Sequence, residues 1–171
     1  MTSPEGTRTE DAVDLEIRRG VPEDLDQVAQ TFTRARREAV PRMPPPVHTA
    51  EEDRAWLADQ LAGERETWLA ERDGRVVGLM LLEDDWVHSL YVRPGLTGRG
   101  IGTTLLDLAK SLRPGGLQLW VFESNTGARR LYERHGFVAV EHTDGAGNEE
   151  RAPDVRMVWS RPQPGYRGRA T

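Results

Sequence analysis

The sequence of 171 residues contains no cysteine, which excludes disulfides, thiolate nucleophiles and metal sites with cysteine ligands. It has no run of about 18 apolar residues, so no segment is expected to span a membrane. Residues 1–14 lack the apolar core of a signal peptide, so we expect a cytoplasmic protein. The net charge of -5 argues mildly against a nucleic-acid partner, because phosphate neutralisation needs a basic surface.

The amino-acid composition is that of an ordinary globular protein, with 37% hydrophobic and 30% charged residues. The polar segment 1–14 and the segment 161–171, which is rich in Pro, Gly and Arg, are expected to be disordered tails. We therefore expect a single domain over residues 15–160. Most of the five Trp residues are expected in its core, with Trp86 as a candidate for lining a substrate pocket.

Hydrophobic periodicity divides this domain into alternating strands and helices. Thr49 and Glu52 have the spacing of a capping box, which predicts a helix over residues 50–62. Asp73-Gly74 between two apolar runs predicts a hairpin. Further helices are expected from Pro22 to the Pro-rich segment 41–46, over 99–112 and over 125–135. Strands are expected around residues 15–17, 67–72, 75–82, 86–92, 117–122, 137–142 and 155–159. This order predicts an α/β or α+β fold with one layer of mixed sheet and helices on its faces.

The sharpest local feature is the segment LTGRGIG (96–102), which lies between a predicted strand and an amphipathic helix. Glycines at every second position allow the backbone to approach a ligand closely. The first N–H groups of a helix have no partner within it and attract anions. A phosphate group is therefore the expected ligand, although a glycine-rich turn without a ligand is the alternative.

Two common phosphate motifs do not fit this segment. A Walker A loop requires Lys and Ser or Thr after its last glycine, whereas Ile101 follows Gly100. The dinucleotide fingerprint requires a third glycine, where this chain has Thr103 or Leu105. The segment is instead similar to the pyrophosphate turn of the GCN5-related N-acetyltransferases, Gln/Arg-x-x-Gly-x-Gly/Ala. It departs from that pattern at Thr97, which stands in place of Gln or Arg.

Two neighbouring segments strengthen the resemblance. The strand HSLYVRP (88–94) resembles the fourth strand of this family. The segment 123–137 resembles the second family signature, Asn-x-x-Ala-x-x-x-Tyr-Glu-x-x-Gly-Phe. It matches at Asn125, Ala128, Tyr132, Glu133, Gly136 and Phe137.

The resemblance implies a fold, a co-substrate and a set of binding residues. The expected fold is a mixed, mostly antiparallel sheet splayed between its fourth and fifth strands, with helices on both faces. Acetyl-CoA would insert its pantetheine arm into the splay and pair with the fourth strand, and no metal is expected. The residues that would contact it are Leu90, Tyr91, Val92, Thr97, Gly98, Arg99, Gly100, Ile101, Gly102, Thr103, Asn125, Ala128 and Arg129.

The chemistry implied is direct transfer of an acetyl group to a primary amine. His88 is the leading candidate for the base, because its ordinary pKa suits proton transfer near pH 7 and arylalkylamine acetyltransferases carry a His at the matching place. A polar residue on a sheet face is the alternative for His88, and the acidic turn 83–85 is an alternative proton acceptor. Tyr132 is the candidate acid for the departing thiolate, with a core tyrosine as its alternative. Asn125 could also serve only as a helix cap.

The acceptor is expected to be a small-molecule or peptide amine, bound by residues 36–50 and the loop 143–154. These segments contain Met43, His48 and the acidic residues Glu149, Glu150 and Asp154. The alternative for both segments is a solvated loop with no role in binding. A competing hypothesis is a non-catalytic module that senses acetyl-CoA on the same fold, and the resemblance also allows a homodimer.

Overall fold

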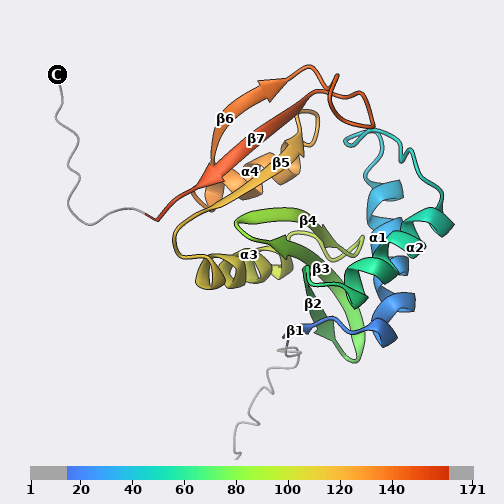
Figure 1. Ribbon diagram of the computed structural model, residues 1–171. Coiled ribbons are helices and arrows are strands. Elements are labelled where there is room, and N and C mark those ends of the chain that lie inside the picture. Colours follow the sequence, from blue (N-terminus) through green and yellow to red (C-terminus); the bar gives the residue numbers. More distant parts are fainter. Residues whose placement is uncertain (1–14, 162–171) are drawn as a thin grey trace, which may run out of the picture.

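The computed structural model describes residues 15–161, so the tails expected at 1–14 and beyond residue 161 lie outside it (Figure 1). The described residues form a seven-stranded sheet in the order β1-β2-β3-β4-β5-β7-β6. All neighbouring strands are antiparallel except β4 and β5, which run parallel. The elements in chain order are β1 (Glu16–Arg19), the 3-10 turn η1 (Pro22–Asp24), α1 (Leu25–Glu38), α2 (Ala50–Ala62), β2 (Glu66–Arg72), β3 (Arg75–Glu83), β4 (Trp86–Val92), α3 (Ile101–Leu112), β5 (Leu117–Phe122), α4 (Thr126–Arg134), β6 (Val138–Thr143) and β7 (Asp154–Trp159).

Local sequence signals account for several of these boundaries. Thr49 Oγ1 accepts a hydrogen bond from the N–H of Glu52, and the Glu52 carboxylate accepts one from the N–H of Thr49, so α2 begins where the capping box predicts. Asp73 and Gly74 both have positive φ, 53° and 70°, which is the backbone of the expected tight hairpin between β2 and β3. The predicted order of elements is therefore confirmed.

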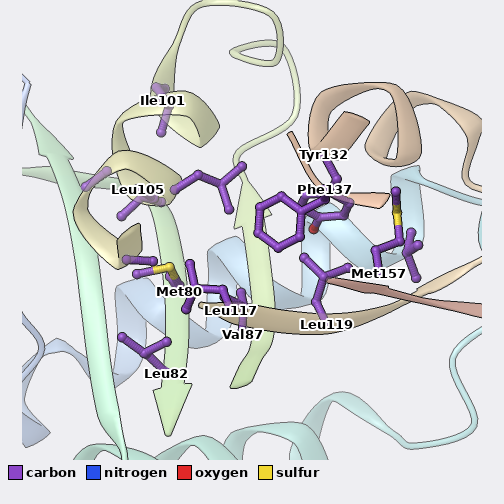
Figure 2. Packing of buried hydrophobic residues seen from close by; sticks show 14 of the residues in the cluster. Met80, Leu82, Val87, Ile101, Leu105, Leu117, Leu119, Tyr132, Phe137 and Met157 are labelled. Carbon is purple, nitrogen blue, oxygen red and sulfur yellow. The ribbon is translucent and has the colours of Figure 1, made fainter. Parts of the chain in front are cut away.

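Helices on both faces of the sheet enclose two clusters of buried side chains. On one face, α1 and α2 place Val28, Phe32 and Leu57 against Leu69 and Leu79 of the sheet. On the other face, α3 and α4 cover a larger cluster that crosses from β3 to β7. Figure 2 shows its members, including Met80, Leu82, Val87, Ile101, Leu105, Leu117, Leu119, Tyr132, Phe137 and Met157.

The expectation that most Trp residues lie in the core is wrong. No Trp residue in the described part of the chain is fully buried, and Trp56 and Trp120 are 37% and 42% exposed. Trp56 packs against the Phe32 ring, at 5.8 Å between centroids, and is partly open to solvent.

The two halves of the sheet differ in how many of their faces are covered by helices. Strands β1 to β4 have α1 and α2 on one face and α3 on the other, whereas β5, β7 and β6 are covered by α4 on one face only (Figure 1). The opposite face of this second half carries half-buried and exposed residues, including Trp120 and Val158. None of the helices between residues 15 and 161 is long and apolar enough to cross a bilayer.

Candidate active site

A hollow of about 610 Å³ opens where β4 and β5 diverge. Trp86 and Gln118 are the one pair that joins these strands in the described residues, while β4 is paired along its length with β3 and β5 with β7. The splay implied by the family resemblance is therefore present. The hollow is lined by residues 87–91 of β4, residues 120–122 of β5 and, from the start and inner face of α4, by Asn125, Ala128 and Tyr132.

A β-bulge in β4 lies at the edge of this hollow. Leu81 of β3 pairs with Ser89, and the next residue, Leu82, pairs with Val87. His88 is therefore the extra residue of the bulge, which increases the local twist and turns β4 away from β5. The bulge accounts for two features together, the opening of the sheet and the presentation of His88 beside the hollow.

The turn before α3 has the backbone of an anion site. Gly98 and Gly100 have φ of 75° and 82°, a left-handed conformation that favours glycine, and a Cβ added to either would meet no atom within 4 Å. Within residues 15–161, the first backbone hydrogen bond of this helix runs from Thr104 to Gly100, which leaves the N–H groups of residues 99–103 without a backbone acceptor. These groups and the helix dipole favour a negatively charged ligand.

Three residues expected at this anion site, Ile101, Gly102 and Thr103, hold the helix in place instead. Ile101 is 1% exposed within the core. A Cβ at Gly102 would lie 3.2 Å from Leu131, so this glycine allows close packing of α3 on α4. Thr103 Oγ1 lies 3.1 Å from His135 Nε2. Only the backbone N–H groups of these three residues are placed for a ligand, whereas Thr97 and Arg99 are exposed side chains.

The central residues of β4 face different sides of the sheet. Leu90 and Val92 pack against the cluster covered by α3, and Tyr91 packs edge-on against Phe32 of α1 at 5.0 Å. Beyond Trp86, in the described sheet, the β4 backbone facing β5 has no strand partner. The backbone groups of Leu90 and Val92 can therefore accept an extended ligand as an added strand.

Tyr132 is buried yet reaches the hollow. Tyr132 is 7% exposed, and its ring centroid lies 5.7 Å from that of Phe137. Figure 2 shows both side chains within the buried cluster. Burial raises the pKa of the phenol above its ordinary range, and no hydrogen bond from the described residues offsets this effect. The hydroxyl is therefore protonated near neutral pH and has its donor available to a ligand in the hollow.

The start of α4 is fixed by Asn125 and Arg129. Asn125 Oδ1 accepts a hydrogen bond from the N–H of Ala128, so the expected capping role is present, and Asn125 also lines the hollow. Arg129 folds back to donate to the carbonyl of Glu123 at 3.3 Å. Its Nε is buried without a partner among the described residues.

His88 is held in a chain of charged groups. Its Nε2 lies 3.1 Å from a Glu83 carboxylate oxygen, and Glu83 in turn accepts a hydrogen bond from Arg65 at 2.8 Å. Partial burial lowers the pKa of His88, with Arg65 adding to this effect and Glu83 opposing it. The imidazole is therefore neutral at pH 7. The carboxylate favours the proton on Nε2, which leaves the Nδ1 lone pair to accept a proton.

Both segments expected at the acceptor contribute residues to the lining of the hollow. Met43 comes from the α1–α2 connection, and Asn148, Glu150 and Asp154 come from the loop after β6 and the start of β7. Ion pairs join both α1 and the α1–α2 connection to this loop. Arg36 of α1 contacts Glu150 at 3.0 Å, and His48 contacts Glu149 at 2.8 Å, while His48 itself does not line the hollow.

Trp120 lines the hollow, although the sequence analysis did not identify it as a candidate. Trp86, which was the candidate, lies at the end where β4 and β5 pair and is not among the lining residues in the described range. A signal for Trp120 exists in the sequence. Leu117, Leu119 and Val121 alternate toward the core, so the intervening Trp120 must face the other side of β5.

Comparison with known proteins gives concordant results. The family model "Acetyltransferase (GNAT) family" matches residues 28–137. Peptidyl-lysine N-acetyltransferase YjaB of Salmonella typhimurium is 37% identical over 82 residues, which cover 47% of this chain and 56% of that protein. The chain spans about half the length of the first curated relatives that it matches.

Solved structures show the same fold. A GCN5-related N-acetyltransferase from Rhodopseudomonas palustris is 27% identical, with a TM-score of 0.71 over 85% of this chain and 95% of that one. The yncA protein of Salmonella typhimurium, solved with its cofactor acetyl-CoA, is 18% identical with a TM-score of 0.65, over 92% and 99% of the two chains. With the family model covering most of the domain, the chain belongs to the acetyltransferase (GNAT) family.

Proposed function

We propose that this protein is an N-acetyltransferase that moves an acetyl group from acetyl-CoA to a primary amine. The observation that carries the proposal is the single Trp86–Gln118 pair between β4 and β5, which leaves a hollow bounded by Leu90, Asn125 and Tyr132. The family match and the related fold solved with acetyl-CoA support the choice of co-substrate.

The turn before α3 and the splay have complementary roles in holding acetyl-CoA. The diphosphate would accept hydrogen bonds from the N–H groups of residues 99–103, because these have no backbone acceptor of their own in the described chain. The pantetheine arm would pair with the free edge of β4 near Leu90 and Val92. The thioester would then lie at the inner end of the hollow, which Tyr132 lines.

The amine must lose a proton before it can attack. A free alkyl amine with a pKa of about 10.4 is only about 0.04% neutral at pH 7, a cost of about 4.6 kcal/mol. His88 Nδ1 is the proposed proton acceptor, because the lowered pKa keeps the imidazole neutral at pH 7. The Glu83 carboxylate beside Nε2 stabilises the imidazolium that forms.

Transfer then requires one bond to form and one to break. The amine nitrogen attacks the thioester carbonyl carbon, and a backbone N–H near Leu90 stabilises the developing oxyanion. The C–S bond breaks, and Tyr132 donates its phenolic proton to the departing thiolate. Burial keeps this hydroxyl protonated until that step. The acetylated nitrogen releases its surplus proton to solvent and the Tyr132 phenolate regains a proton from solvent, so the products are an acetylated amine and CoA.

The test is thiol release from acetyl-CoA with a panel of primary amines, with the acetylated product identified by mass spectrometry. The proposal requires amine-dependent release of CoA and a product heavier by one acetyl group. Tight binding of acetyl-CoA without turnover of any amine would instead support the non-catalytic sensor.

A further inference from the structure

The charged side chains that line the acceptor half of the hollow are all acidic. Three carboxylates line it, those of Glu141, Glu150 and Asp154, and none of its lining residues in the described chain is Arg or Lys. Two of the three are neutralised by partners outside the lining. Arg156 donates to Glu141 at 2.9 Å, and Arg36 donates to Glu150 at 3.0 Å.

Asp154 differs from these two carboxylates. Its hydrogen bonds come from neutral groups, the Thr143 hydroxyl and the Asn148 amide, the latter at 3.0 Å. No Lys, Arg or His of residues 15–161 lies within ion-pair distance of it. Neutral donors fix the orientation of a carboxylate without supplying a positive charge, so a cationic ligand can pair with Asp154 directly.

Trp120 stands beside Asp154 on the same open face of the sheet. Trp120 is opposite Arg156, and Asp154 is two residues before Arg156, so the two side chains are diagonal neighbours about 7–8 Å apart at the backbone. Trp120 is 42% exposed and lines the hollow. An indole face and a carboxylate at this spacing can hold one cationic group between them.

A second, independent group indicates a ligand at the other end of the same hollow. The Tyr132 hydroxyl belongs to a side chain more than nine-tenths buried and has no hydrogen-bond partner within the described residues. It faces the hollow beside Leu90. The hollow therefore has a reacting end at Tyr132 and a charged end at Asp154.

We propose that the acceptor is an amine that carries a second positively charged group, held between Asp154 and Trp120 while the other amine is acetylated. Short diamines and amines with a distal guanidinium have this chemistry. The inference rests on the proposed function, because it takes the hollow as the acceptor site of the acetyl transfer.

The test uses diamines with three to eight carbons, each compared with the monoamine of equal length. We expect at least one diamine to exceed its matched monoamine in kcat/KM by tenfold or more, well above the factor of two from having two amines. Asp154→Asn, which preserves shape, should reduce this preference at least tenfold. Trp120→Leu should reduce it severalfold. The control Glu123→Gln, which alters an exposed carboxylate outside the hollow, should retain it.

Equal kcat/KM within every pair, or a preference unchanged by Asp154→Asn, would overturn the inference and leave the acetyltransferase activity intact. If no amine is acetylated, the proposed function fails instead. Calorimetry of each diamine with the CoA-saturated protein then decides the inference. Binding that Asp154→Asn weakens tenfold supports the charged end, and absence of binding overturns it.

Discussion

Trp86 and Gln118 form the one residue pair that joins β4 to β5 in the described sheet. From this pair onward the strands separate, and Trp120 and Phe122 of β5 line a hollow with Ser89 and Leu90 of β4. Beyond this pair, β4 and β5 form no ladder of backbone hydrogen bonds with each other, so backbone N–H and C=O groups at the centre of the sheet lack strand partners. A ligand with its own amide groups can satisfy that backbone, which connects this pair directly to the proposed function.

The hydroxyl of Tyr132 provides the first prediction. Tyr132→Phe should lower kcat at least tenfold, because the departing thiolate loses its proton donor while the ring packing on Phe137 is preserved. The dissociation constant for acetyl-CoA, measured by calorimetry, should change little. Urea unfolding of the variant serves as the control for the fold. An unchanged kcat would remove Tyr132 from the mechanism.

The turn before α3 gives a prediction with a matched control. Gly100→Glu should abolish CoA binding, because a carboxylate would occupy the space where the diphosphate is expected. Gly95→Glu introduces the same charge at a glycine with nearly the same left-handed φ, 84° against 82°, and with equally open surroundings. It should retain binding, since Gly95 precedes the helix N-terminus by several residues. Loss of binding in both variants, or in neither, would contradict the assignment.

His88 predicts a pH dependence. Its pKa is lowered from 6.5 by burial, so the base is neutral at pH 7 and protonates as the pH falls below that lowered pKa. With saturating substrates, kcat should therefore decline on the acid side of pH 6.5. His88→Gln should reduce kcat at pH 7 at least tenfold and remove this decline. His142→Gln alters an exposed histidine of β6 and should preserve it.

Much of the fold follows from local signals that the sequence contains. The reciprocal bonds of Thr49 and Glu52, the positive φ of Asp73 and Gly74, and the Asn125 cap of α4 are each fixed by a few neighbouring residues. Such features depend little on the rest of the chain, so spacing alone predicts them. The family resemblance adds the splay, which no local pattern reveals.

The residues proposed to bind the acceptor could be recognised only in the three-dimensional structure. Asp154 is one acidic residue among several in its loop, and its lack of a cationic partner depends on where Arg156 and Arg36 lie. The bulge at His88 depends on the register between β3 and β4, which the alternation of side chains does not determine. Trp120 could have been placed by the period of β5.

An ion pair near the N-terminus of α1 gives a stability prediction. Both Asp24 carboxylate oxygens accept hydrogen bonds from Arg18 at 2.8 Å, and Asp24 is 8% exposed. Asp24→Asn should lower the free energy of unfolding by about 2 kcal/mol, as expected for hydrogen bonds to a charged group. Urea denaturation at pH 7 measures this. Asp26→Asn, whose carboxylate is exposed, is the control and should cost much less.

The same ion pair predicts how that difference varies with pH. Arg18 holds the pKa of Asp24 below its ordinary value of 3.8, so the stabilisation is present above that value. It should disappear as the pH falls through the lowered pKa of the folded state, where wild type and Asp24→Asn should approach equal stability. A difference that stays constant over this range would exclude Arg18 as its source.

The most direct test of the account is an amide NMR titration of the protein with CoA. If CoA binds as proposed, the largest shifts will occur at the backbone amides of residues 99–103 and in residues 90–92 of β4, with the Tyr132 resonances responding in the same titration. Shifts confined to other surfaces, with these amides unchanged at saturation, would contradict it.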